Sequence, residues 1–282
     1  MGRILGGTVL WSPKNGSPQT PFQESLYMLK PEETIHACLG PRWAHVPVLA
    51  LDETDSTNTR LKAWAREGRI TAPYMLTADS QTAGRGRLGR RFVSPPGTGL
   101  YMSLLVQPPQ GADAGRITIL AAVAVCKAIH ERTGLQPKIK WVNDLFLRGK
   151  KVCGILAEGV QQGVVVGIGV NLKTPPGGFP PEAAIAGALD TETDRFALAG
   201  TIARHFLDGM EKLDTGEAIA YYRAHMPLIG RDIHYTENGH EKNARVTGVA
   251  DDGGLMIEDE EGPHVLRTGE VSLGSQGFEG LL

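Results

Sequence analysis

The chain has 282 residues, of which 41% are hydrophobic, and a formal net charge of −2. That length can bury the core of one large domain, alone or with a smaller one. The near-zero charge argues against a protein that binds nucleic acid or membrane surfaces through its overall charge. The most apolar long stretch, residues 117–129, contains Lys127 and is too short to span a membrane. The three cysteines are too few and too isolated for a disulfide framework or a zinc site and are typical of a cytoplasmic protein: Cys38, Cys126 and Cys153.

The first 47 residues contain six prolines and show no sustained helical repeat. Because proline removes a backbone donor and interrupts helices, we expect an extended N-terminal arm. A strand is predicted at residues 48–51. The turn Asp55-Ser56-Thr57 then offers cap residues for a helix that runs to about residue 67.

The middle of the chain alternates between helix and strand patterns. Residues 116–132 are apolar nearly all round, which predicts a central helix. Helical repeats also cover residues 196–213 and 218–226, and residues 175–181 are expected to form a loop. Strands with turn residues between them are predicted at 74–78, 100–106, 137–141, 145–147, 152–158 and 164–170. The pattern indicates an α+β fold with a mixed central sheet flanked by helices.

The C-terminal segment differs in both pattern and charge. Residues 231–282 hold eleven acidic and four basic residues, a charge of −7, whereas the other 230 residues carry +5. Turn signals at 237–239 and 251–254 predict hairpins. The short strands are predicted at 232–235, 244–249, 255–258 and 264–267. We therefore expect three parts: an N-terminal arm (1–47), a large domain (48–228) and a small β-barrel domain (229–282).

The most informative segment is residues 84–91, called the Gly-Arg loop below, which holds four arginines and three glycines. Glycine allows close backbone approach and arginine binds anionic oxygens in pairs, so the loop is predicted to wrap an anionic small molecule. The spacing also matches a dinucleotide fingerprint, but Pro95 and Pro96 prevent the helix that such a motif needs. Arg90 and Arg91 exclude a P-loop. An RNA-binding patch is disfavoured by the balanced charge, and a solvated basic turn stays as the simplest alternative.

Five further polar clusters lie at turns between apolar strands: residues 55–58, 81–83, 140–144, 150–156 and 167–171. Each is weak alone. In this order and spacing, together with the Gly-Arg loop, they resemble the biotin protein ligases. The resemblance runs from about residue 51 to 172 and resumes in the small β domain, ending near residue 273. Its most specific parts are residues 77–90 and the segment Lys140-Trp141-Val142-Asn143-Asp144.

The resemblance implies a catalytic domain similar to class II aminoacyl-tRNA synthetases, followed by a small SH3-like β-barrel. It also implies roles for particular residues, of which Arg85, Arg87 and Lys151 would be catalytic. The implied biotin-binding residues are Ser56, Thr57, Asn58, Gln81, Arg85, Gly86, Arg87 and Lys151. The implied nucleotide-binding residues are Arg90, Lys140, Asn143, Asp144 and Asn171.

From the residues alone, simpler interpretations stay open. Ser56 can be a plain helix cap, Lys151 a solvated surface lysine and Asn171 a turn residue. Two positions depart from the family pattern. Val142 stands where the family usually has Pro, and Phe92 stands where it often has Trp; both keep apolar character, so ligand affinity is more in question than activity.

The implied reaction activates biotin with ATP to biotinyl-5'-AMP and transfers the biotin to a lysine of a biotin carboxyl carrier protein. Biotin, ATP and Mg²⁺ carried by ATP are the expected cofactors, with no metal site on the protein. A lipoate or octanoyl ligase or transferase of the same architecture is the nearest alternative, and a non-enzymatic RNA-binding module is one of a different class. We expect a cytoplasmic monomer or homodimer that contacts no membrane.

Some members of the family are also DNA-binding repressors. We expect the form without an N-terminal DNA-binding domain, and therefore no nucleic-acid partner. Only 47 residues precede the first predicted strand of the large domain, and their six prolines are expected to prevent the necessary helices. Their four basic and three acidic residues offer little charge for phosphates.

Overall fold

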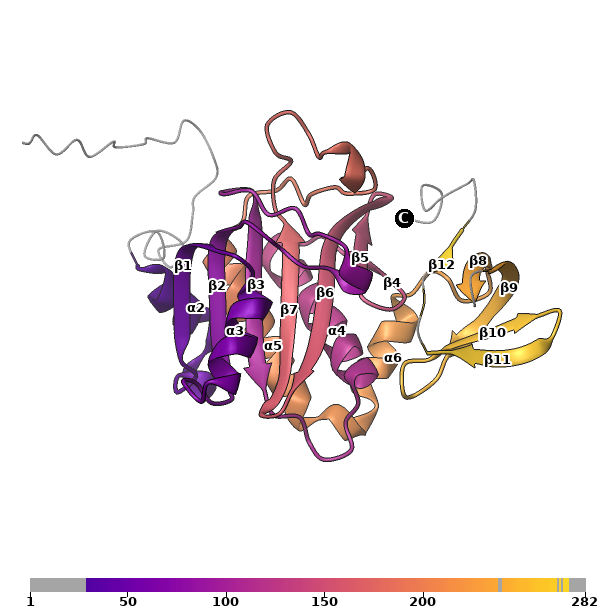
Figure 1. The fold of residues 1–282 in the computed structure, drawn as a ribbon, viewed down its shortest axis with the longest axis horizontal. Coiled ribbons are helices and arrows are strands. Elements are labelled where there is room, and N and C mark those ends of the chain that lie inside the picture. Colours follow the sequence, from indigo (N-terminus) through magenta and orange to yellow (C-terminus); the bar gives the residue numbers. More distant parts are fainter. Residues whose placement is uncertain (1–28, 238–239, 268, 270, 274–282) are drawn as a thin grey trace, which may run out of the picture. The chain divides into compact units, whose positions relative to one another are not determined.

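A seven-stranded mixed sheet organises the larger part of the molecule (Figure 1). The computed structural model describes residues 29–237, 240–267, 269 and 271–273. The strand order is β1-β2-β3-β7-β6-β5-β4, in which β1 and β2 are parallel and the other neighbours antiparallel. The strands are β1 (Val48–Thr54), β2 (Tyr74–Gln81), β3 (Gly99–Val106), β4 (Lys138–Lys140), β5 (Asp144–Leu147), β6 (Lys150–Val160) and β7 (Gly163–Asn171).

Helices cover both faces of this sheet. The helix α3 (Thr57–Arg66) packs on one face, against β2, β3, β6 and β7, and lies in front of the sheet in Figure 1. The other face carries α4 (Ala114–Thr133) and α5 (Arg195–Glu211), with α6 (Glu217–Ala224) against α4. The α3 face is therefore the less thickly covered one, and α3 begins where the pocket described below opens.

The central helix follows directly from its sequence. Asp113 caps its first turn by accepting from the Arg116 N–H at 2.8 Å, and Gly134 ends it in the left-handed conformation with φ of 74°. Between these signals twelve side chains are buried. The predicted central helix at 116–132 is confirmed.

The interpretation of residues 1–47 as an extended arm is wrong for residues 31–43. Residues 1–28 lie outside the described residues, but Pro31–Leu39 form the helix α2 and Pro41–Trp43 a 3₁₀ turn. Proline is tolerated in the first turn of a helix, because the N–H groups of that turn have no intrahelical acceptor and the loss of one breaks no hydrogen bond. Ile35 and Leu39 are fully buried against α5, so this segment belongs to the core.

The C-terminal strands form a second, antiparallel sheet of five strands, in the order β11-β10-β9-β8-β12. The strands are β8 (Asp232–Glu237), β9 (His240–Val249), β10 (Leu255–Asp259), β11 (Gly262–Leu266) and β12 (Val271–Ser272). The predicted α+β class with a small C-terminal β module is confirmed. The division into domains at residues 47 and 228 stays a prediction.

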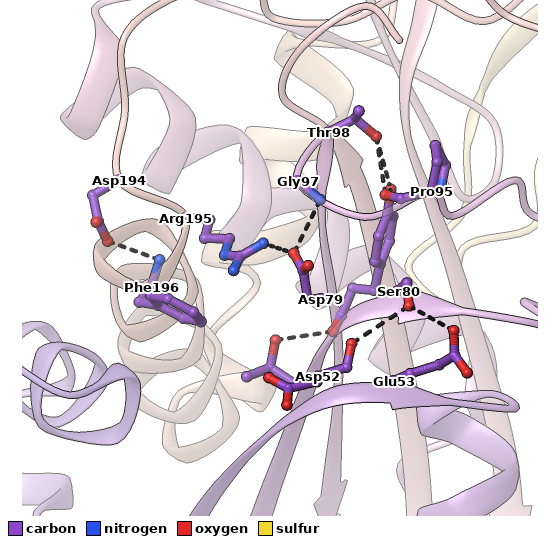
Figure 2. A network of polar contacts seen from close by, with 12 residues as sticks. Asp52, Glu53, Asp79, Ser80, Pro95, Gly97, Thr98, Asp194, Arg195 and Phe196 are labelled. Carbon is purple, nitrogen blue, oxygen red and sulfur yellow. Dashed lines mark hydrogen bonds and ion pairs between the residues drawn. The ribbon is translucent and has the colours of Figure 1, made fainter. Parts of the chain in front are cut away.

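A polar network fixes the segment that follows the Gly-Arg loop (Figure 2). Asp79, near the end of β2, accepts from the Gly97 N–H at 3.0 Å and pairs with Arg195 at the start of α5. Tyr101 donates from its hydroxyl to the Pro95 carbonyl at 3.0 Å. The far end of the loop segment is thus tied to both the sheet and α5, which leaves residues 84–91 as a loop between fixed ends.

Candidate active site

A pocket of about 450 Å³ opens between the N-terminus of α3, the Gly-Arg loop, the middle of the large sheet and the C-terminal sheet. Its wall contains every site residue expected from the sequence. These thirteen residues are Ser56, Thr57, Asn58, Gln81, Arg85, Gly86, Arg87, Arg90, Lys140, Asn143, Asp144, Lys151 and Asn171. The structure therefore brings them together, while the role of each stays a prediction.

The N-terminus of α3 supplies one end of the pocket. Ser56 is the helix cap, and its Oγ lies 3.5 Å from the Thr59 amide nitrogen. The Thr57 N–H donates to Gln81 Oε1 at 2.9 Å, and the Gln81 amide donates in turn to Ser94 Oγ at 2.9 Å. Ser56 therefore is a helix cap, and it also faces the pocket.

Asn58 is buried and fixed from several sides. Ser103 Oγ lies 2.6 Å from Asn58 Oδ1 and 2.7 Å from Thr57 Oγ1, so its single proton serves one of them at a time. Asn58 Nδ2 donates to the Leu156 carbonyl at 3.2 Å and to Glu158 Oε2 at 3.0 Å. This end of the pocket consists of neutral amide and hydroxyl groups, which suits a ligand with both N–H donors and a carbonyl acceptor.

Three glycines on adjacent strands form the floor of the pocket. A Cβ at Gly167 would lie 2.3 Å from Asn58 Oδ1, and a Cβ at Gly169 would lie 2.6 Å from the Phe92 ring. Gly154, paired with Gly169 across β6 and β7, would place a Cβ 3.2 Å from the same ring. Only glycine lets the aromatic ring and the Asn58 amide approach the sheet this closely.

The arginines of the Gly-Arg loop reach different partners. Arg85 Nη1 lies 3.1 Å from the carboxylate of Glu158 on β6. Arg87 donates to Asn143 Oδ1 at 3.1 Å, and Arg91 donates to the Thr82 carbonyl at 2.9 Å. The loop is therefore attached at one side to β6 and at the other to the segment that begins β5.

Lys151 and Asp144 form an ion pair at 2.7 Å, with side chains 25% and 18% exposed. Lys151 is thus a half-buried pocket residue and not a freely solvated lysine. Asn171 donates to the Gly187 carbonyl at 2.9 Å and lies 3.5 Å from the Lys151 carbonyl. Asn171 therefore joins the end of β7 to β6 and to the loop before α5, so it is not merely a turn residue.

Charge in the pocket is mainly positive. Its wall has six Lys and Arg side chains and three Asp and Glu side chains. The cations gather on the Gly-Arg loop, at Lys140 and at Lys151, whereas the wall residues at the α3 end are uncharged; Glu158 lies behind them, outside the wall. A ligand with a neutral polar end and an anionic end matches this distribution.

Sequence reasoning missed several wall residues. Phe179, Glu182 and Ile185 come from the predicted loop before α5 and the residues after it, and their sequence carries no motif. The C-terminal sheet contributes another group: His234, Tyr235, Thr236, Glu241, Gly269, Val271 and Ser272. Alternation along 232–236 was the available signal, but which face of that sheet meets the large domain depends on long-range packing.

The C-terminal sheet is held against the site by a specific contact. Trp141 is buried, and its indole N–H donates to the Gly253 carbonyl at 2.8 Å. Arg223 of α6 donates to the Val249 carbonyl at 2.6 Å. The Trp141 side chain therefore both fills apolar space and, through its N–H, attaches the turn between β9 and β10.

The described residues offer neither a metal cluster nor a membrane-spanning helix. No cluster of three or more His, Cys, Asp or Glu side chains in the described ranges is arranged to hold a metal ion. Within the same ranges, none of the helices combines the length and the apolar character needed to cross a membrane.

Comparison with known proteins agrees with the geometry. Residues 50–174 match the model of the biotin/lipoate A/B protein ligase family. A biotin--[acetyl-CoA-carboxylase] ligase of Paracoccus denitrificans is 32% identical over 243 residues, covering 79% of this chain and 99% of the relative. A bifunctional ligase/repressor of Bacillus subtilis is 33% identical over 226 residues, 71% of this chain, and the match spans 66% of that relative's length.

Solved structures give the same result. The biotin protein ligase of Aquifex aeolicus in complex with biotin and ATP superimposes with a TM-score of 0.70 at 29% identity, covering 80% of this chain and 97% of that one. The family model, the near-complete coverage of the Paracoccus relative and the shared fold all agree. The chain belongs to the biotin protein ligases, within the biotin/lipoate A/B protein ligase family.

Proposed function

We propose that this protein activates biotin with ATP to biotinyl-5'-AMP and transfers the biotin to a lysine of a biotin carboxyl carrier protein. The observation that carries the proposal is the single pocket in which the thirteen expected residues meet. The Paracoccus relative is a biotin--[acetyl-CoA-carboxylase] ligase, and one solved neighbour is a biotin protein ligase that holds biotin and ATP.

In the first step, a biotin carboxylate oxygen attacks the α-phosphorus of ATP. A P–O bond forms to the carboxylate, the bond to the leaving pyrophosphate breaks, and a mixed anhydride results. Both reactants are anionic, so positioning and fixed positive charge are the contributions expected from the protein. Arg87 and Lys151 are the proposed sources, since both side chains line the pocket where the loop and β6 approach each other.

The neutral end of the pocket is proposed to hold the ureido ring of biotin. That ring has two N–H donors and one carbonyl acceptor, and the α3 end offers hydroxyl and amide groups of both kinds. The glycine floor lets Phe92 and Asn58 lie directly on the sheet, and the bicyclic ring of biotin is proposed to lie beside them. Biotin's carboxylate would then point toward Lys151 and the Gly-Arg loop.

In the second step, the amine of the carrier lysine attacks the acyl carbon of the anhydride and AMP leaves with the bonding electrons. The amine must lose a proton, and Asp144 is a carboxylate within the pocket, 2.7 Å from Lys151. Asn143 and Asp144 are the proposed organisers of the nucleotide and the incoming amine. Mg²⁺ would arrive with ATP and neutralise its triphosphate; no residue is assigned to hold it.

The exchange of radiolabelled pyrophosphate into ATP tests this proposal and its nearest alternative. We expect exchange that depends on biotin and is absent with lipoate or octanoate in its place. Exchange with lipoate alone would show a lipoate ligase, and no exchange with any of the three acids would contradict the proposal. Transfer is then measured as biotin bound to an added carrier domain, with its acceptor lysine replaced by arginine as the control.

A further inference from the structure

Glu158, the carboxylate near the end of β6, is the meeting point of three groups from different parts of the chain. Lys62 of α3 lies 2.5 Å from Glu158 Oε1, Asn58 Nδ2 lies 3.0 Å from Oε2, and Arg85 of the Gly-Arg loop lies 3.1 Å away. The Glu158 side chain is only 17% exposed. Burial alone would raise its pKa, but the hydrogen bonds from Lys62 and Asn58 and the charges of Lys62 and Arg85 outweigh burial and lower the pKa, so the carboxylate is ionised at neutral pH.

An ionised carboxylate only accepts hydrogen bonds, and this fixes the orientation of the Asn58 amide. Both groups in contact with Asn58 Nδ2, the Glu158 carboxylate and the Leu156 carbonyl, are acceptors. The amide must therefore turn Nδ2 toward β6 and Oδ1 toward Ser103 and Gly167. At the proposed biotin end of the pocket, Asn58 therefore offers its Oδ1 as an acceptor, while its Nδ2 donor is directed toward β6.

The same carboxylate attaches the Gly-Arg loop. Arg85 is the first arginine of the loop, and its ion pair with Glu158 joins the loop to β6, one of the two strands that carry the pocket floor. The two residues are 73 positions apart in the chain, so the contact ties the loop to a strand outside its own local segment. Arg85 therefore has a carboxylate partner inside the protein, whereas Arg87 has a neutral amide partner in Asn143.

We propose that Glu158 is a positioning residue for the ligase reaction, which orients the Asn58 amide and anchors the Gly-Arg loop through Arg85. Arg85 then serves mainly to hold the loop, and Arg87 and Lys151 provide the positive charge at the reacting groups. This inference rests on the proposed function, since it assigns what Glu158 does for biotin binding in that pocket.

The test compares Glu158→Gln, Arg85→Gln and the double variant with the wild-type enzyme. The dissociation constant of biotin is measured by titration, and cleavage after Arg87 by trypsin is followed by mass spectrometry. Because each single variant removes a hydrogen bond between charged groups, it should weaken biotin binding about tenfold and speed the cleavage. Because both act through one ion pair, the double variant should be no worse than the more affected single variant.

Lys62→Met is the matched control, because it removes the other cation of Glu158 and leaves the loop contact in place. It should change biotin binding less than twofold, and Glu158→Asp should recover part of the loss seen with Gln. Equal losses in Lys62→Met and Glu158→Gln would show that Glu158 only holds α3 and would overturn the proposal. The proposal would also be overturned if the losses of biotin affinity in the two single variants multiplied in the double variant. Wild-type biotin binding and tryptic cleavage in Arg85→Gln would overturn it as well, because the half-exposed Arg85 side chain can be replaced without unfolding the protein. Absence of biotin-dependent exchange in the wild-type enzyme would instead contradict the proposed function itself.

Discussion

Arg87 donates a hydrogen bond to Asn143 Oδ1 at 3.1 Å and so joins the Gly-Arg loop to a segment 56 residues further along the chain. Asn143 is itself fixed by two hydrogen bonds to Ile155. Its side-chain Nδ2 donates to the Ile155 carbonyl at 2.8 Å, and its backbone carbonyl accepts from the Ile155 N–H at 3.0 Å. The guanidinium is thereby held at the pocket by a rigid neighbour on the sheet, while its charge has no carboxylate partner among the contacts that the structure shows for it.

The first prediction concerns the release of the intermediate. Arg87→Ala should still form biotinyl-5'-AMP but should lose it to solvent, because a charged donor to its phosphate is missing. Removing one donor of this kind costs about 2.7–4 kcal/mol in oxyanion-type sites, so release should accelerate at least a hundredfold. The measurement is the labelling of bystander proteins with biotin. Retention of the adenylate as tight as in the wild type would show that another arginine holds it.

The second prediction separates two adjacent lysines. Lys151→Ala should slow biotin-dependent pyrophosphate exchange by about a hundredfold or more, as expected for a lost cation near the reacting oxygens. Lys150→Ala is the control, since Lys150 is exposed and outside the pocket wall. Similar rates in the two variants would remove Lys151 from the first step.

The third prediction concerns the loop as a whole. Biotin and MgATP together should slow tryptic cleavage within residues 84–91, because the ligand would add contacts to a loop whose tip is exposed; Leu88 is 70% accessible. From the sequence alone, four mutually repelling arginines on a glycine-rich backbone are expected to need a bound anion before the loop becomes ordered. In the structure Arg85, Arg87 and Arg91 already have protein acceptors, so protection should be several-fold rather than complete. Equal cleavage rates with and without ligands would count against loop closure.

The folding pattern was largely readable from the sequence because its signals are local. Asp113 and Gly134 mark the ends of α4, and short apolar segments between turn residues mark the strands of both sheets. The helix α2 is not predicted from the sequence, because the six prolines of residues 1–47 favour an extended segment. Its own signals were present: Pro31 opens the helix, acidic residues fill the first turn, and Gly40 with φ of 88° follows it.

The candidate site was predictable only where it consists of contiguous motifs. Ser103 and Glu158, which contact the wall residue Asn58, lack such a motif, and so do the wall residues of the C-terminal sheet. Pairings that span large parts of the chain bring all of them to the site. Ser103 lies 45 positions from Asn58, and Glu158 lies 100 positions from it. The register of β3 on β7 and the placement of α3 decide these contacts, and no local pattern specifies them.

A fourth prediction follows from the ionisation of Glu158. The pKa of Glu158 is lower in the folded protein than its ordinary value of 4.5, because hydrogen bonds and nearby cations outweigh burial. A carboxyl whose pKa is depressed by folding stabilises the protein above its unfolded pKa and loses this contribution as the pH falls through the folded value. The stability difference between the wild type and Glu158→Gln, measured by urea unfolding, should therefore be constant near neutral pH and shrink below about pH 4.5. A difference that grows on acidification would contradict the assignment.

The last prediction uses the glycine floor to locate the ligand. Gly167→Ala would place a methyl group 2.3 Å from Asn58 Oδ1, so the amide must move and the proposed biotin end must change shape. Overpacking of this kind costs about 1–3 kcal/mol, and we expect the KM for biotin to rise about tenfold or more, with a smaller change in the KM for ATP. Gly159→Ala is the matched control on β6, because a Cβ there meets nothing within 4 Å. If Gly167→Ala instead raised only the KM for ATP, the neutral end of the pocket would be the nucleotide end, and the orientation of both substrates proposed here would have to be reversed.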